Sequence, residues 1–132
     1  MNIELVDRTV VTKELDTFDT DIIWILSSFA IQNSQVSIYR FSQYSETIGY
    51  IRNHNKCIDI FVVKKYRNMS HGANMIRNFL IHTRTTEFMA FVSVYNSKAI
   101  FFFDKLCKKI KFVKMQKIIS DKIISYSFSI EK

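Results

Sequence analysis

Apolar and polar residues alternate along most of this chain in short runs, and the pattern predicts a series of β-strands. A run of four to eight residues rich in Ile, Val, Phe and Tyr, bounded by polar turn residues, is typical of a strand. The predicted strands are Ile3–Val6, Val36–Phe41, Thr47–Ile51, Cys57–Val63, Phe88–Tyr95, Ile110–Met115 and Ile123–Ile130. Cys57–Val63 is almost wholly apolar, which is expected of a central strand. The last strand places Ile and aromatic residues on one face and serines on the other.

Three segments show helical periodicity instead. Thr17–Phe29 carries a cluster of apolar residues, and Asp16 or Thr17 can cap its N-terminus. Ala73–Leu80 and Ala99–Leu106 each repeat apolar residues every three or four positions, as a helix lying on a sheet does. Strands that alternate with such helices predict an α/β layer fold.

Length and composition place limits on the class of protein. A chain of 132 residues, 48% hydrophobic and 23% charged, is expected to form one globular domain over residues 1–132. Its longest apolar run, Ile22–Ile31, is shorter than the roughly 20 residues that a membrane span needs. Met1–Leu5 lacks the pattern of a signal peptide, so we expect a cytoplasmic protein with no membrane association.

Cysteine and histidine do not form a metal-binding pattern. Cys57 and Cys107 are the two cysteines, and His54, His71 and His82 stand far apart in the sequence. We therefore predict no metal. The cysteines are expected to act as small buried hydrophobes, and a disulfide or a nucleophile remains an alternative for either.

Two motifs lie between the fourth strand and the second amphipathic helix that follows it. The first is Arg67-x-x-Ser70-x-Gly72, between the apolar strand and the helix that contains Ala73. The N-terminus of a helix exposes unpaired N–H groups, and small residues before it let an anion approach the backbone. An ordinary strand-to-helix turn is the alternative. The second motif is Asn96-x-x-Ala99-x-x-Phe102-Phe103-x-Lys105.

Together these motifs resemble those of the GNAT superfamily of acetyl-CoA-dependent N-acetyltransferases. The family's phosphate loop reads Arg/Gln-x-x-Gly-x-Gly/Ala, and its later motif reads Asn-x-x-Ala-x-x-Phe-Tyr-x-Lys-x-Gly-Phe. This chain has Ser70 in place of a Gly, Phe103 in place of the Tyr, and Cys107-Lys108 in place of Gly-Phe. The resemblance implies a single-layer, mixed but mostly antiparallel sheet flanked by helices.

The resemblance also implies a cofactor site. Loop and helix amides would hold the pyrophosphate of acetyl-CoA, and the end of the preceding strand would pair with the pantetheine arm. The residues carried over are Val62, Val63, Arg67, Asn68, Met69, Ser70, His71, Gly72 and Ala73. Ser70 would cost roughly 1 kcal/mol if the loop demands a positive φ there. Asn96 would bond the pantetheine arm, or alternatively cap the helix that follows it.

Two further positions concern catalysis. Asp59 stands where some family members carry a carboxylate that receives the proton of the amine. A carboxylate among apolar neighbours is suited to this role, and the alternative is a strand-face Asp that reaches solvent or a lysine. Phe103 occupies the place of the Tyr that protonates the departing thiolate, and it cannot donate a proton. The protein could then be slow, use another donor such as Tyr95, Ser97 or Tyr126, or be catalytically silent.

The leading hypothesis is an enzyme that transfers an acetyl group from acetyl-CoA to a primary amine by direct attack. One alternative is a silent module that binds CoA or a protein partner. The other is a nucleic-acid-associated protein, which the net charge of +7 and the sequence pI near 9.5 favour. Lysines are concentrated at positions 108, 109, 111, 114 and 117, where they could be a solvated face, attract CoA or contact nucleic acid.

The acceptor is not fixed by the sequence. Members of the family act on aminoglycosides, polyamines, protein amines and aminoacyl-tRNA. A basic chain disfavours a polycation and favours an acidic protein or charged RNA. Because family members often dimerise, a homodimer is compatible with the resemblance.

Overall fold

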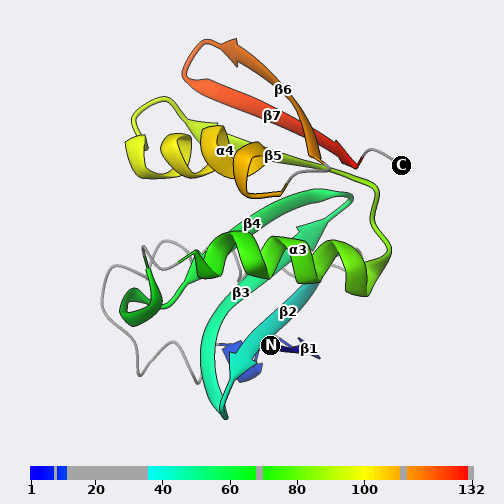
Figure 1. Ribbon diagram of the computed structural model, residues 1–132. Helices are drawn as coiled ribbons and strands as arrows, with labels where there is room; N and C mark the ends of the chain where they lie inside the picture. The colour runs from blue at the N-terminus through cyan, green and yellow to red at the C-terminus, as the bar shows by residue number, and fades with distance from the viewer. Residues whose placement is uncertain (8, 12–35, 68–69, 111–112, 131–132) are drawn as a thin grey trace.

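The computed structural model describes residues 1–7, 9–11, 36–67, 70–110 and 113–130 (Figure 1). Within these residues the strands are β1 (Asn2–Val6), β2 (Val36–Gln43), β3 (Glu46–His54), β4 (Cys57–Val62), β5 (Glu87–Ser93), β6 (Val113–Ser120) and β7 (Ile123–Ile130). The helices are the 3₁₀ turn η2 (Lys64–Tyr66), α3 (His71–Thr83) and α4 (Ser97–Lys109), and residues 9–11 are helical as well. The helix predicted over Thr17–Phe29 lies outside the described residues.

The strands form one seven-stranded sheet in the order β1-β2-β3-β4-β5-β7-β6. Every neighbouring pair is antiparallel except β4 and β5, which are parallel. The predicted mixed, mostly antiparallel sheet is therefore confirmed. Figure 1 shows β1–β4 as one half of the sheet and β5–β7 as the other.

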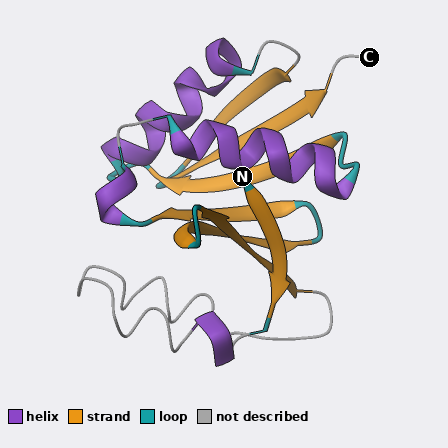
Figure 2. Ribbon diagram, turned by 60° about the horizontal axis from the view of Figure 1, so that its bottom comes forward, coloured by secondary structure: helices purple, strands orange, loops and turns teal. Residues whose placement is uncertain are grey.

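Both α3 and α4 pack on the same face of this sheet (Figure 2). Their apolar residues, among them Phe79 and Phe103, form one core with the inward side chains of β5 and β7. On the opposite face of the first half, Val11, Ile38, Tyr50 and Phe61 form a second, smaller core. No helix among the residues described here is long and apolar enough to cross a membrane.

Several predicted strand boundaries differ from those of the structure. Ile110 does not begin a strand: it closes α4 by donating its N–H to the carbonyl of Leu106 at 2.8 Å, and it is fully buried. The strand begins instead at Val113 and runs to Ser120, because pairing with β7 continues as far as the turn, where Ser120 lies opposite Ile123. Likewise β3 extends to His54, beyond the predicted end at Ile51, and its turn to β4 falls at Asn55 and Lys56.

Tight turns in this chain are made without glycine. Among the described residues, those with positive φ are Tyr44, Ser45, Asn55, Lys56, Ser70, Arg84 and Asp121. The two glycines serve close packing instead. At Gly49 a Cβ would lie 2.1 Å from the carbonyl oxygen of Phe61, so this position lets β3 and β4 approach each other.

Candidate functional site

The centre of the sheet is only partly paired, and this feature defines the candidate site. Strands β4 and β5 share the single pair Cys57↔Met89, supported by a 2.7 Å hydrogen bond from the N–H of Met89 to the carbonyl of Lys56. Beyond that pair β4 runs on to Val62 and β5 to Ser93 with no further ladder between them in the described residues. The two strands therefore enclose a wedge that opens toward their C-terminal ends.

Backbone groups aim into this wedge from both strands. The N–H of Val63 donates to the carbonyl of Ile48 at 2.8 Å, so the odd-numbered residues of β4 bond to β3. Alternation along the strand then directs the backbone groups of Ile60 and Val62 toward β5. By the same argument, the bond from Ile130 N–H to Thr86 carbonyl (2.7 Å) directs those of Phe91 and Ser93 toward β4.

Arg67 anchors the chain where it leaves β4. Its Nε donates to the carbonyl of Val62 at 2.8 Å, and its guanidinium lies 5.5 Å from the ring centroid of Phe61. The Arg67 side chain thus holds the end of the strand in place, which the sequence motif alone did not indicate.

The N-terminus of α3 follows directly and keeps its amide donors available. Ser70 is the N-cap residue, with φ 64° and ψ 10°, and its side chain makes no capping hydrogen bond. The first turn, which begins with His71, Gly72 and Ala73, contains no acidic residue. These N–H groups and the helix dipole are the groups on which the motif predicts an anion site, and Ser70 has the left-handed conformation that Gly adopts more easily. Asn68 and Met69 lie outside the described residues.

The turn before this helix is held by a residue from a distant strand. Glu46 of β3 accepts hydrogen bonds from Lys65 Nζ, at 2.7 Å, and from the hydroxyl of Tyr66. The bond from Lys65, followed by that from Tyr66, lowers the pKa of the Glu46 carboxyl. The Tyr66 ring in turn packs edge-on against His71, with centroids 5.3 Å apart. Sequence reasoning missed Glu46, because no local pattern links residues about twenty positions apart.

Gly72 allows α3 and α4 to pack closely against each other. It is buried, and a Cβ at this position would lie 2.7 Å from Cε1 of Phe102 on α4. A substitution at Gly72 would therefore disturb the contact between α3 and α4 as well as the anion site. It is not a clean probe of binding.

Asp59 is not surrounded by apolar side chains as its sequence neighbours suggested. Alternate residues of β4 point to opposite faces, so Asp59 lies on the face away from α3, opposite Arg52 of β3. Its Oδ2 lies 3.1 Å from Arg52 Nη1, and its side chain is 46% exposed. This pairing matches the alternative of a strand-face carboxylate that reaches solvent and a basic side chain. A role as general base stays a prediction.

Asn96 and Phe103 have structural partners. Asn96 is the N-cap of α4, and its Oδ1 accepts the N–H of Ala99 at 3.1 Å, as the capping alternative predicts. Phe103 is 4% exposed and packs against Tyr126 and Phe128. Its ring is a core side chain on the inner surface of α4.

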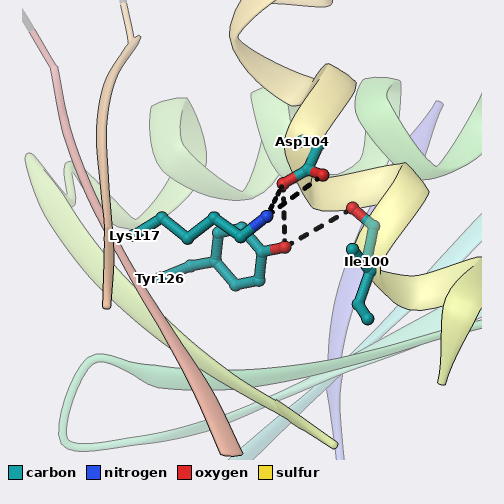
Figure 3. Close-up of polar contacts among 4 residues, drawn as sticks. All are labelled: Ile100, Asp104, Lys117 and Tyr126. Atoms are coloured by element: carbon teal, nitrogen blue, oxygen red, sulfur yellow. Dashed lines mark hydrogen bonds and ion pairs between the residues drawn. The ribbon is translucent and has the colours of Figure 1, made fainter. Parts of the chain in front are cut away.

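The hydroxyl of Tyr126 lies in a polar cluster on α4 rather than in the wedge. It donates to Asp104 Oδ1 at 2.9 Å and lies 3.5 Å from the carbonyl of Ile100 (Figure 3). Lys117 Nζ completes the cluster, 3.0 Å from the same carboxylate oxygen. Burial, and then the hydrogen bond to Asp104, raise the pKa of Tyr126 well above its usual value. The proton of this hydroxyl is donated to Asp104 and does not point into the wedge.

Replacing Asp104 should expose a pH-dependent contribution of this cluster to stability. Burial alone would raise the pKa of Asp104, but hydrogen bonds from Lys117 and Tyr126 outweigh it and hold that pKa below its ordinary value. Because the folded-state pKa is depressed, the stabilisation is present above the unfolded pKa near 4 and is lost on acidification below it. Asp104→Asn should therefore lower the free energy of unfolding by about 0.5 kcal/mol at pH 7, because solvent screens a side chain that is 38% exposed, and by less at pH 3. Urea titrations of both proteins at the two pH values measure this, and a difference that grows at pH 3 would contradict it.

Neither cysteine has the environment of a reactive thiol. Cys57 and Cys107 are unpaired and partly buried. Burial raises the pKa of both thiols, and the nearby Asp59 carboxylate adds to the effect at Cys57. Among the residues that the structure covers, no three His, Cys, Asp or Glu side chains gather in a group that could hold a metal ion.

Comparisons by sequence find no relative, whereas comparison by structure does. No family model and no curated protein matches the sequence. A point mutant of spermidine N-acetyltransferase from Vibrio cholerae superposes with a TM-score of 0.64 at 10% identity, over 98% of this chain and 95% of that one. The ribosomal-protein-S18-alanine N-acetyltransferase of Escherichia coli gives 0.63 at 12% identity, over 99% and 94%. An IAA acetyltransferase from Bacillus cereus gives 0.59 at 13% identity, over 98% and 99%.

These structures share an arrangement of strands and helices with this chain over nearly its whole length. At such identities the likeness establishes the fold alone. The chain has the GNAT acyltransferase fold, as its two motifs indicated.

Proposed function

We propose that this protein transfers an acetyl group from acetyl-CoA to a primary amine by direct attack. The observation that carries the proposal is the wedge between β4 and β5, which opens beside the N-terminus of α3. The backbone groups of Ile60 and Phe91 face the wedge, where β4 and β5 form no further ladder in the described residues, and the helix amides next to it carry no side-chain cap from Ser70. Acetyl-CoA has the matching shape, an extended arm with amide groups joined to a pyrophosphate.

Each part of the site has a distinct role in this proposal. The first-turn amides of α3 bind the pyrophosphate, and the backbone of Ile60 and the N–H of Val62 pair with the pantetheine arm. Val63, which the sequence also assigned to the arm, donates its N–H to Ile48 of β3, so that assignment is wrong for its N–H. An amide of β4 that points at the thioester oxygen would stabilise the negative charge that develops there. Asn96 keeps its amide nitrogen for the arm, since its Oδ1 caps α4. Asp59 accepts the proton of the amine.

Departure of the thiolate needs no tyrosine at position 103. A thiol has a pKa of about 8.5, so its thiolate is a tolerable leaving group near neutral pH and can take a proton from water. The loss of a general acid typically costs a factor of about 10² to 10⁴ in rate. The proposed enzyme is therefore expected to be slower than one that carries a tyrosine donor.

A silent CoA-binding module is the second candidate, and two observations favour it. Phe103 is a core residue that can donate no proton, and Ser70 occupies a left-handed position at the edge of the anion site. The two candidates share cofactor binding and differ in turnover. Thiol release in the presence of amines separates them.

Ser70→Asp should weaken acetyl-CoA binding without weakening the fold. Asp tolerates the left-handed conformation, and a carboxylate at a helix N-terminus stabilises it by about 0.3–1 kcal/mol. The same charge would repel the pyrophosphate by about 1–4 kcal/mol at close range, which is roughly a 5- to 1000-fold rise in Kd. Calorimetric titration with acetyl-CoA and with CoA measures the change.

Ser45→Asp is the matched control, because Ser45 is also an exposed serine with a φ of 64° but lies in the β2–β3 turn. It should bind acetyl-CoA as the wild type does. Equal affinity of the folded Ser70→Asp and wild-type proteins would move the site away from α3. If the wild type bound neither acetyl-CoA nor CoA, the proposed function itself would be wrong.

A further inference from the structure

The β5 side of the wedge carries exposed apolar side chains. On β5, Met89 is 38% exposed and Phe91 is 53% exposed. The parallel pair Cys57↔Met89 places the odd-numbered residues of both strands on the same face of the sheet. Met89 and Phe91 therefore share a face with Asp59, on the side away from α3 and α4.

Phe91 is also level with Asp59 across the wedge. Counting two residues along each strand from the pair Cys57↔Met89 reaches Asp59 on β4 and Phe91 on β5. A continued parallel ladder would bring these two strands to about 4.8 Å, but here the strands have separated. A carboxylate on one side and an aromatic ring on the other thus flank the opening.

The rest of this face continues the apolar surface. Ser125 of β7 lies directly opposite Phe91, and Ile118 of β6 lies opposite Ser125 on the far side. Ile118 is 61% exposed, and the small serine between the two larger side chains leaves both accessible. We call Met89, Phe91 and Ile118 the apolar shelf.

The charges on this face are balanced rather than acidic. The carboxylates that β1, β4 and β5 present here are all paired with basic side chains. These ion pairs are Glu4–Arg40 at 2.5 Å, Asp59–Arg52 at 3.1 Å and Glu87–Lys56 at 2.7 Å. A polycation needs several carboxylates free to bind its ammonium groups, and the described residues of this face do not supply them.

We propose that the apolar shelf binds the acceptor, and that the acceptor is a primary amine joined by a short linker to an aromatic or other apolar group. This inference rests on the proposed function. The apolar group would lie on Phe91 and Met89, and the amine would reach into the wedge beside Asp59. The carbon–nitrogen bond forms and the carbon–sulfur bond breaks. The amine proton passes to the Asp59 carboxylate, and the CoA thiolate takes a proton from water.

The test compares two acceptors, 2-phenylethylamine and spermidine, at saturating acetyl-CoA with thiol release as the readout. The wild type should show a kcat/KM for 2-phenylethylamine at least about tenfold above that for spermidine. Phe91→Ala removes the ring from the shelf and should raise the KM for 2-phenylethylamine about tenfold, with kcat little changed. Phe101→Ala is the matched control, because Phe101 is also an exposed phenylalanine (65%) but lies on α4, and it should change neither constant.

A second measurement does not depend on turnover. With methyl-labelled methionine, the NMR signal of Met89 should shift and saturate as 2-phenylethylamine is added to the CoA-bound protein, and should not shift with spermidine. A Met89 signal that stays in place, a preference for spermidine, or an unchanged KM in Phe91→Ala would each overturn the inference. If acetyl-CoA still binds in that case, the proposed function stands and only the acceptor is wrong. If acetyl-CoA does not bind at all, both fail.

Discussion

Gly49→Ala should lower the free energy of unfolding by about 3 kcal/mol or more. A Cβ at this position would lie 2.1 Å from the carbonyl oxygen of Phe61 and 2.9 Å from Cε of Met75. The Phe61 carbonyl belongs to β4, which is paired with β3 along its length, so the strand itself would have to move. Urea unfolding followed by circular dichroism measures the loss.

The second glycine provides the control for this experiment. Gly72→Ala also creates a contact below 3 Å, but with the end of the Phe102 ring, which can turn aside. Its cost should therefore be clearly smaller than that of Gly49→Ala. Equal costs in the two variants would show that the backbone contact at Phe61 is not what makes Gly49 necessary. Because Gly49 lies opposite Val62, the same substitution should also displace the strand end that borders the wedge.

Asp59→Asn should reduce turnover by a factor of about 10² to 10⁴ if Asp59 is the general base. The amide keeps the shape of the side chain and its place opposite Arg52, but it cannot accept a proton from the amine. Acetyl-CoA affinity should stay within a few-fold of the wild type, since the proposed anion site is on α3. Thiol release with a saturating amine and calorimetry with acetyl-CoA measure the two quantities.

Loss of an ion pair is the competing explanation, and two controls address it. Arg52→Gln breaks the same pair but keeps the carboxylate, so it should retain most of the turnover. Glu87→Gln breaks the Glu87–Lys56 pair on the same face and should have no effect on the rate. If Arg52→Gln loses as much activity as Asp59→Asn, the pair is structural, and the proton must leave by another route.

The features that sequence reasoning predicted correctly are those that local pattern determines. The alternation of aromatic and serine residues in β7 matches its alternating burial, and the apolar spacing in α3 and α4 matches their buried faces. The cost predicted for Ser70 was conditional on a positive φ, and the residue has one. The capping alternative for Asn96 was also a local inference, and the hydrogen bond to Ala99 confirms it.

The features that were missed depend on strand register and on packing between distant segments. Arg52 lies beside Asp59 only because β3 and β4 pair with one particular offset. Whether Phe103 faces the core or the wedge depends on the rotation of α4 over the sheet. The exposure of Phe91 depends on what covers its face of β5. No residue type signals any of these facts in advance, so the role of each candidate catalytic residue could be named from sequence but its surroundings could not.

The single backbone pair between β4 and β5 divides the protein into two mechanical units. Two-residue turns connect β2 to β3, β3 to β4 and β6 to β7, so the hairpins of each unit can form from local contacts, whereas β1 and β5 pair with strands more distant in the sequence. The units are joined mainly by side chains of the core beneath α3 and α4. Local opening can then spread through one unit and stop at the wedge. An extended molecule paired with both β4 and β5 would cross that boundary, and the two units would then unfold together. Its binding would therefore increase the cooperativity of unfolding.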